Sequence, residues 1–279
     1  MLNYSVERFY GPDGARRVPL EYETKTEHFC EQLFRDKYSF PARVGIEVEL
    51  ENIQNGTIDP NLWRLVPDNS LRNRGYEAVS YPLAGNEILL ALAALHLWYE
   101  KNPKSEFSHR CSIHVHLEAV ELTMEQLYVL VGTYMSVENL IFNSLFPTRK
   151  GNNYCFPLNN VLLEKQDLDR VRLNKETWKY AALNLYHLRD FGTLEFRHHP
   201  GTKSVHELLK WIQILGNLDT WAQKTSLKDF KTLLMNLNTT SEYMEYVHQA
   251  LPNLSAKVCT DDMYHAVTAA KVFVNSIKG

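Results

Sequence analysis

The stretch Val44-Gly45-Ile46-Glu47-Val48-Glu49-Leu50 alternates regularly between two kinds of residue. Because successive side chains of a β-strand point to opposite faces, its four large apolar residues would share one face of a strand. Glu47 and Glu49 would share the other face. The alternation predicts a strand over residues 44–52, with one face on a hydrophobic core and two carboxylates on the opposite face.

Two later segments repeat this pattern. In Ile113–Leu117 the apolar residues share one face, and His114 and His116 share the other. In Leu194–Arg197 the polar face carries Glu195 and Arg197. Each segment alone is typical of an antiparallel sheet with one solvated face. Together, however, the polar faces hold three carboxylates, two imidazoles and one guanidinium, which is an unusual set for a merely solvated surface.

This set of side chains suits a bound cation next to a phosphate. Two carboxylates about 7 Å apart on one face repel each other by roughly 0.6 kcal/mol in water, and by more in a medium of lower dielectric constant. Carboxylate-rich sites favour hard cations such as Mg²⁺ or Mn²⁺, and an imidazole is compatible with them. Arg197, two residues from Glu195, adds a guanidinium that can bind phosphate. Metal ions and arginine recur together in phosphoryl transfer.

The rest of the chain mixes strands and helices without regular alternation. Alternating or apolar patterns predict strands over 63–67 and 76–81 and a helix over 86–99. The capping boxes Thr123-x-x-Gln126 and Ser204-x-x-Glu207 predict two further helices. Residues 178–185 fit neither pattern, and the sequence from 227 onward is helical with a break at Pro252.

The dipeptide Asn55-Gly56 follows the first strand and predicts a β-hairpin there. These patterns favour an α+β fold, in which helices pack on one face of a largely antiparallel sheet and the C-terminal tail is helical. We expect an N-terminal extension over 1–42, a catalytic domain over 43–222 and a helical segment over 223–279 that packs on that domain.

Composition excludes several classes of protein. With 279 residues, the chain has room for one or two domains, and 44% apolar and 23% charged residues exclude disordered and collagen-like chains. A net charge of −3 argues against nucleic-acid binding through bulk charge. We expect a cytoplasmic protein without a membrane partner, because the sequence has no long apolar run and no signal-peptide core. Four scattered cysteines without a C-x-x-C pair are consistent with reduced thiols.

No P-loop, dinucleotide-binding or Gly-x-Ser-x-Gly motif is present. The sequence instead resembles the amidoligases, which are carboxylate–amine ligases with a glutamine-synthetase-like fold. The motifs that carry the resemblance follow one another over residues 43–218: Gly45–Glu49, Asp68-Asn69-Ser70-Leu71, Gly75–Ser80, Ile113–His116, Arg149–Tyr154, Ala182–Leu185 and Gly192–Thr202. In the second of these motifs the family usually has Asp-Gly-Ser, whereas this chain has Asn69 at the middle position.

The resemblance implies a curved antiparallel sheet whose concave face holds divalent metal ions and ATP. It implies that the metal ligands are Glu47, Glu49, Glu77, His114 and Glu195. It further implies that His116 and Arg197 contact phosphate, so that Glu47, Glu195 and Arg197 form the catalytic set. Arg149 in the basic loop 147–151 is another candidate for binding phosphate, and Asp68 and Ser70 are candidates for binding substrate.

The expected function is therefore that of an ATP-dependent carboxylate–amine ligase, which forms an amide through an acyl phosphate with Mg²⁺ or Mn²⁺. The expected partners are ATP, a carboxylate and an amine. The amine could belong to an amino acid, peptide, protein or modified nucleoside. The sequence leaves open whether the chain forms a homo-oligomer. Two alternatives remain at this point. One is a non-haem iron or zinc enzyme that uses His114 and His116 with a carboxylate. The other is a catalytically inactive nucleotide-binding module.

Overall fold

The computed structural model describes residues 40, 42–159, 178–256, 258 and 260–277, so nearly all of the expected N-terminal extension lies outside the described residues. The strands are β1 (Val44–Leu50), β2 (Trp63–Pro67), β3 (Tyr76–Ser80), β4 (Ser112–Glu118), β5 (Leu183–Asn184) and β6 (Thr193–Pro200). The helices are α2 (Asn86–Lys101), α3 (Met124–Ser144), the 3-10 turn η2 (Pro147–Arg149), α6 (His187–Phe191), α7 (Val205–Lys224), α8 (Leu227–Asn236), α9 (Thr240–Ala250) and α10 (Thr260–Ser276).

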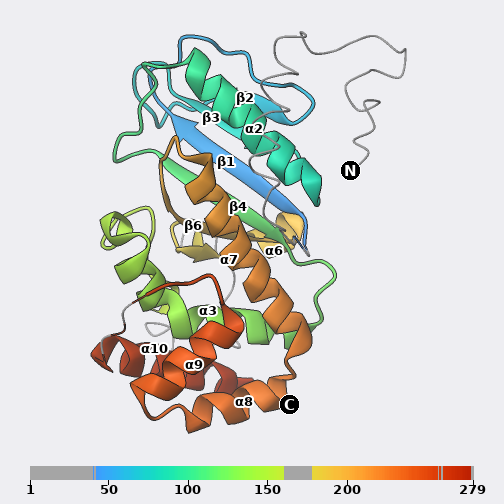
Figure 1. Ribbon diagram of the computed structural model, residues 1–279, viewed down its shortest axis with the longest axis vertical. Helices are drawn as coiled ribbons and strands as arrows, with labels where there is room; N and C mark the ends of the chain where they lie inside the picture. The colour runs from blue at the N-terminus through green and yellow to red at the C-terminus, as the bar shows by residue number, and fades with distance from the viewer. Residues whose placement is uncertain (1–39, 41, 160–177, 257, 259, 278–279) are drawn as a thin grey trace.

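The six strands form one open antiparallel sheet in the order β2-β3-β1-β4-β6-β5. The first strand of the sequence thus lies near the centre of the sheet, between β3 and β4. Figure 1 shows α2 and α7 across one face of this sheet, and α8, α9 and α10 together at one end of the molecule. The predicted α+β class, with an antiparallel sheet and a helical C-terminal part, is confirmed.

The alternation in β1 divides its side chains as the sequence predicts. Val44, Ile46, Val48 and Leu50 are all buried in the main hydrophobic core, whereas the residues between them are partly exposed. Thr123 and Gln126 form the expected capping box at the start of α3. Ser204 caps α7 through the backbone N–H of Glu207, but the Glu207 carboxylate accepts a hydrogen bond from Thr202.

The predicted hairpin at Asn55-Gly56 is wrong, because β1 pairs with β3 and β4 and not with β2. The buried side chain of Asn102, at the end of α2, satisfies the backbone of this loop instead. Its Oδ1 accepts from the N–H groups of Gln54 and Asn55, and its Nδ2 donates to the Asn55 carbonyl. Trp98 Nε1 donates to the same carbonyl. These tertiary hydrogen bonds override the local turn preference of Asn-Gly.

The C-terminal helices pack against α3. α10 lies along α3, and the helices α8 to α10 bury Phe230, Tyr243, Tyr246 and Val274. α9 ends at Ala250, two residues before Pro252, where the sequence predicts a break. The division into three segments stays a prediction, and α7 continues across residue 222. In the part of the chain that the structure describes, no helix has the length and apolar character needed to cross a bilayer.

Candidate functional site

The polar face of the sheet collects the side chains that the three alternating segments carry. On β1, Glu47 stands opposite His114 of β4, and Glu49 stands opposite Glu77 of β3. On the far side of β4, His116 stands opposite Glu195 of β6. Since neighbouring positions on one face of a sheet lie within side-chain reach, the pairing brings these groups together. We call Glu47, Glu77, His114, His116 and Glu195 the central cluster.

A β-bulge adjusts the side of the cluster that faces β6. Two residues of β6, Arg197 and His198, lie between the paired positions Phe196 and His199, whereas His114 alone lies between Val115 and Ile113 of β4. Such an insertion bends a strand and redirects side chains near functional sites. Arg197 and Glu195 remain on the polar face, where they contact each other, while His198 is fully buried against Tyr134 on the core side.

Glu47 connects the two imidazoles of β4. Its Oε2 lies 3.2 Å from His114 Nδ1, and its Oε1 lies 3.2 Å from His116 Nε2. The other nitrogen of each ring contacts a hydroxyl group, with Ser112 Oγ at 2.8 Å from His114 Nε2 and Thr193 Oγ at 3.1 Å from His116 Nδ1. These hydroxyls fix the orientation of the two rings.

Glu195 is buried to 1% exposure, and its two carboxylate oxygens contact different groups. Oε1 lies 2.5 Å from Arg197 Nη1 and 3.2 Å from His114 Nδ1. Oε2 accepts a hydrogen bond from Asn184 Nδ2 at 2.6 Å and lies 3.1 Å from His187 Nε2. The sequence does not predict His187 as a site residue, because the helix α6 that carries it is only five residues long and shows no periodic pattern.

Two groups of side chains in the described residues have donor atoms close enough to share a cation. They are Glu47, Glu77 and His114, and Glu47, His116 and Glu195; within each group the donor atoms lie within 4.8 Å of one another. Each group offers two carboxylates and one imidazole, and Glu47 belongs to both. Oxygen-rich donor sets of this kind fit Mg²⁺ or Mn²⁺ better than thiophilic metals. The residues present therefore fit a hard divalent cation.

Burial and neighbouring charges shift the pKa values of the carboxyl groups in the central cluster. Burial opposes ionisation of Glu47 and Glu195, but the imidazoles beside Glu47 and the guanidinium of Arg197 beside Glu195 bring both pKa values well below the usual range. Burial, together with the charges of Glu47, Glu49 and Asp68, raises the pKa of Glu77 to about 8. A carboxyl group that shares a site with other carboxylates is the group that a cation would ionise.

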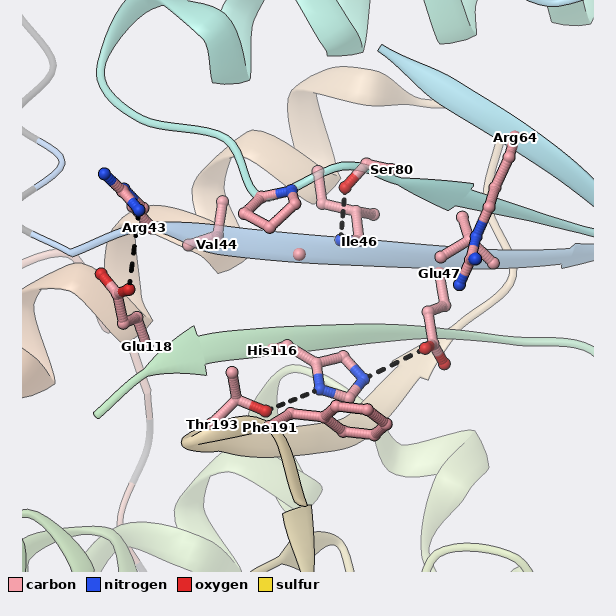
Figure 2. A pocket seen from close by; sticks show the side chains of 13 residues that line it. Arg43, Val44, Ile46, Glu47, Arg64, Ser80, His116, Glu118, Phe191 and Thr193 are labelled. Carbon is pink, nitrogen blue, oxygen red and sulfur yellow. Dashed lines mark hydrogen bonds and ion pairs between the residues drawn. The ribbon is translucent and has the colours of Figure 1, made fainter. Parts of the chain in front are cut away.

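A pocket of about 320 Å³ opens on one side of the central cluster. Most of the surface of its wall is apolar, and we call it the apolar pocket. It is lined by Val44, Gly45, Ile46, Val79, Pro82 and Phe191 together with Arg43, Glu47, Arg64, Ser80, His116, Glu118 and Thr193. Figure 2 shows Arg43 with Glu118 at one end of this pocket and Arg64 at the other, where the Arg64 side chain is directed toward Glu47.

A second pocket, of about 330 Å³, opens at the opposite end of the same strands. Charged and hydroxyl side chains dominate its wall, and we call it the charged pocket; it is lined by Glu49, Asp68, Ser70, Arg110, Ser112, Tyr154, Lys179, Tyr180 and Arg197. Along β1, Gly45 faces the apolar pocket, Glu47 the centre and Glu49 the charged pocket. β6 repeats this order with Thr193, Glu195 and Arg197.

The remaining candidates lie outside the two cation-binding groups. The Glu49 carboxylate accepts hydrogen bonds from Ser112 N and Oγ, both at 2.7 Å. The Asp68 carboxylate accepts from the backbone and the hydroxyl of Ser70, and both residues line the charged pocket. Arg149 is 3% exposed, lines neither pocket and donates to the carbonyl oxygen of Arg197 at 3.1 Å. It thus contacts the backbone of the strand that carries Arg197.

The sequence was compared with models of known protein families and with curated proteins. Residues 59–218 match the family model described as "Putative amidoligase enzyme". The match covers 160 of the 279 residues, which is more than half of the chain. It includes Glu77, His114, His116, Glu195 and Arg197. No protein with a curated description matches the chain.

Proposed function

The chain belongs to the amidoligase family, and from this membership we propose that it is an ATP-dependent ligase that joins a carboxylate to an amine. A carboxylate is a poor electrophile, so direct attack by an amine is slow. In the proposed reaction a carboxylate oxygen attacks the γ-phosphorus of ATP, the bond from that phosphorus to the bridging oxygen breaks, and ADP leaves with the electron pair. The product of this step is an acyl phosphate.

In the second step the amine nitrogen attacks the acyl carbon. The bond from that carbon to the phosphate oxygen breaks, inorganic phosphate leaves, and the nitrogen loses a proton to give the amide. The reaction therefore consumes ATP, a carboxylate and an amine, and it releases ADP, phosphate and the amide. Both steps develop negative charge on phosphate oxygens, which cationic groups in a water-poor site can stabilise.

The observation that supports this proposal most is the position of the central cluster between two pockets. A ligase of this kind must bring the γ-phosphate of ATP against a carboxylate, and the two molecules approach from different directions. Glu47 and His116 line the apolar pocket, while Arg197 lines the charged pocket and contacts Glu195. Molecules that fill the two pockets would have their reacting ends at the cluster.

We assign the nucleotide to the apolar pocket. Gly45 has no side chain there, and Val79, Pro82 and Phe191 offer the apolar surface that a flat base requires. Phe191 is 66% exposed, and its ring stacks on His187 at a centroid distance of 5.1 Å. The phosphates would then extend toward His116 and Arg64, with the γ-phosphate at the cluster.

Magnesium would be held by Glu47, Glu77, His114 and Glu195, with Glu49 as a further candidate, and it would neutralise charge on the phosphate oxygens. His116 would contact phosphate, since Glu47 and Thr193 fix its ring at the edge of the apolar pocket. Arg197, held by Glu195, would stabilise charge on the transferred phosphoryl group. Arg149 would support Arg197 through its backbone carbonyl, and Asp68 and Ser70 would contact substrate.

The iron or zinc alternative is less well supported. Iron oxygenase sites use two imidazoles and one carboxylate on a single metal ion. In the described residues His114 and His116 fall into different groups, each with two carboxylates. The donor balance therefore favours a hard cation.

The proposal is tested by incubating the purified chain with ATP, Mg²⁺, panels of amines and a set of ¹⁸O-labelled carboxylates. We expect ADP release that depends on a carboxylate, and we expect the ¹⁸O label in the released phosphate, because one carboxylate oxygen leaves with the phosphoryl group. AMP release, or ADP release with unlabelled phosphate, would contradict the acyl-phosphate route. Nucleotide binding without turnover across the panels would instead support an inactive module.

A further inference from the structure

His187 begins the short helix α6 and contacts the buried carboxylate of Glu195. Its Nε2 lies 3.1 Å from Glu195 Oε2, the oxygen that also accepts a hydrogen bond from Asn184 Nδ2. An ionised carboxylate only accepts hydrogen bonds, so Nε2 is the donor in this contact. The other ring nitrogen, Nδ1, is buried and has no hydrogen-bond partner among the residues that the structure describes. The contact with Glu195 therefore fixes the orientation of this imidazole.

The same ring contacts two side chains of the apolar pocket. It stacks on Phe191, with ring centres 5.1 Å apart and an angle of 28° between the ring planes. The ring of His116 lies 5.3 Å from it. Phe191 and His116 line the apolar pocket, whereas His187 does not. Because the Phe191 side chain is largely exposed, the stacked imidazole limits how the phenyl ring can turn.

The two contacts use different parts of one imidazole. The contact with Glu195 needs a nitrogen that donates a hydrogen bond, and the contact with Phe191 needs a flat ring. Glu195 belongs to one of the two groups that could share a cation, and Phe191 belongs to the wall that we assign to the base. A group that orients a metal ligand typically lowers the metal affinity by about tenfold or more when it is removed.

We propose that His187 is a positioning residue for both binding events at this site. Its Nε2 orients Glu195 for the cation, and its ring supports Phe191 as the surface on which the base stacks. The inference rests on the proposed function, and it gives a role to a residue outside both cation-binding groups. In this role His187 touches neither the cation nor the nucleotide.

Two substitutions separate these roles. His187→Gln keeps a side-chain N–H at a similar reach but removes the ring, whereas His187→Phe keeps an aromatic ring but removes the nitrogen. Mn²⁺ binding without nucleotide, followed by electron paramagnetic resonance, tests the first role. Calorimetry with adenosine and a chelator tests the second role, because adenosine carries the base and no phosphate. His248→Gln and His248→Phe, at an exposed position of α9, are the matched controls.

We expect each variant to fail in a different assay. His187→Phe should weaken Mn²⁺ binding by about tenfold and leave adenosine binding within about twofold of the unmodified chain. His187→Gln should weaken adenosine binding by about fivefold and leave Mn²⁺ binding within about twofold. Because each variant keeps one affinity, its loss of the other cannot come from unfolding. Both His248 variants should bind the two probes as the unmodified chain does.

Three results would overturn the inference. Equal losses of both affinities in the two variants would indicate a purely structural role, and unchanged affinities in both would show that His187 has no role in binding. Loss of Mn²⁺ binding in His187→Gln as well as in His187→Phe would make the imidazole a cation ligand and not a positioning residue.

The outcome is separable from that of the proposed function, because neither assay needs turnover. Opposite losses in a chain without ligase turnover would leave the positioning role standing. Ligase turnover in a chain whose variants do not show opposite losses would refute the positioning role alone. An unmodified chain that binds neither probe would also refute the positioning role, and the ¹⁸O experiment would then decide the ligase activity separately.

Discussion

At the scale of single residues, Glu47 organises the cluster because its two carboxylate oxygens contact two different imidazoles. The alternation of β1, β4 and the start of β6 was enough to predict which side chains share the polar face. It could not predict that this face is largely buried, since Asn184 and His187 reach Glu195 from β5 and α6. Residues 178–185 show no pattern of their own, so the contacts of Asn184 depend on tertiary structure.

Arg197 should be sensitive to a change that preserves its charge. In Arg197→Lys the ammonium keeps a positive charge, but it lacks the planar fork that now contacts Glu195. We expect the rate of carboxylate-dependent ADP release to fall by about a hundredfold, while Mn²⁺ affinity changes little. Arg189→Lys, at an exposed position of α6, is the control. Equal rates for Arg197→Lys and this control would show that the guanidinium has no role in phosphoryl transfer.

Glu138 gives the fold a pH dependence that is independent of the cluster. Its fully buried carboxylate accepts hydrogen bonds from Tyr134 Oη and from the N–H groups of Leu158 and Asn159. Burial raises its pKa to about 7, from an ordinary glutamate value of 4.5. Between these two values the folded chain binds the proton that the unfolded chain has released, so stability should fall as the pH rises.

The comparison of Glu138→Gln with the unmodified chain isolates this effect. Between about pH 5 and about pH 8, the unmodified chain should lose about 3 kcal/mol of unfolding free energy relative to the variant. Urea unfolding at several pH values measures the difference, and Glu125→Gln, at an exposed position of the same helix, is the control. A difference that does not change with pH would contradict the assignment of a raised pKa to Glu138.

At the scale of elements, the sequence predicts the order and bounds of most strands and helices, because each has a clear period or cap. It could not predict which strands are neighbours. Asn55-Gly56 suggests a hairpin, but Asn102 binds that loop and β3 takes the place beside β1. The bulge opposite His114 also has no local signal, since it depends on the register between β4 and β6.

Gly192 joins α6 to β6, and a side chain at this position should destabilise the fold. It ends α6 in the left-handed region, with φ at 66°, and a Cβ atom there would lie 2.2 Å from Val120 Cγ1. Gly192→Ala should lower the unfolding free energy by about 2 kcal/mol, from backbone strain and steric overlap. In Gly56→Ala the nearest atom to the new Cβ is 3.9 Å away, so stability should change by less than about 0.5 kcal/mol. Similar losses in both variants would contradict this account.

At the scale of the whole molecule, the central cluster divides the polar face of the sheet into two pockets of nearly equal size, about 320 and 330 Å³. The sequence predicts the residues of the cluster but not the pockets, because segments far apart in the chain form their walls. Arg110, Tyr154 and Lys179 come together only in the folded chain. We assign the nucleotide to the apolar pocket and the carboxylate substrate to the charged pocket because the chemistry of the two walls differs.

Filling the apolar pocket should separate the two binding events. A Cβ atom on Gly45 would lie 3.4 Å from His116 Cβ, so Gly45→Val requires a small shift and places a branched side chain in the pocket. We expect its affinity for the ATP analogue to fall by about tenfold, while the affinity for Mn²⁺ without nucleotide stays unchanged. If Gly45→Val bound the analogue normally, the nucleotide would have to occupy another site.

We propose that Glu47 and its neighbours hold a divalent cation for the reaction with ATP. Titration of the chain with Mn²⁺, followed by electron paramagnetic resonance with and without ATP, measures this directly. We predict saturable Mn²⁺ binding that ATP strengthens, that Glu47→Gln reduces by about tenfold or more, and that Glu121→Gln, at an exposed position, leaves unchanged. Equal Mn²⁺ binding by Glu47→Gln and the unmodified chain would show that Glu47 does not hold the cation.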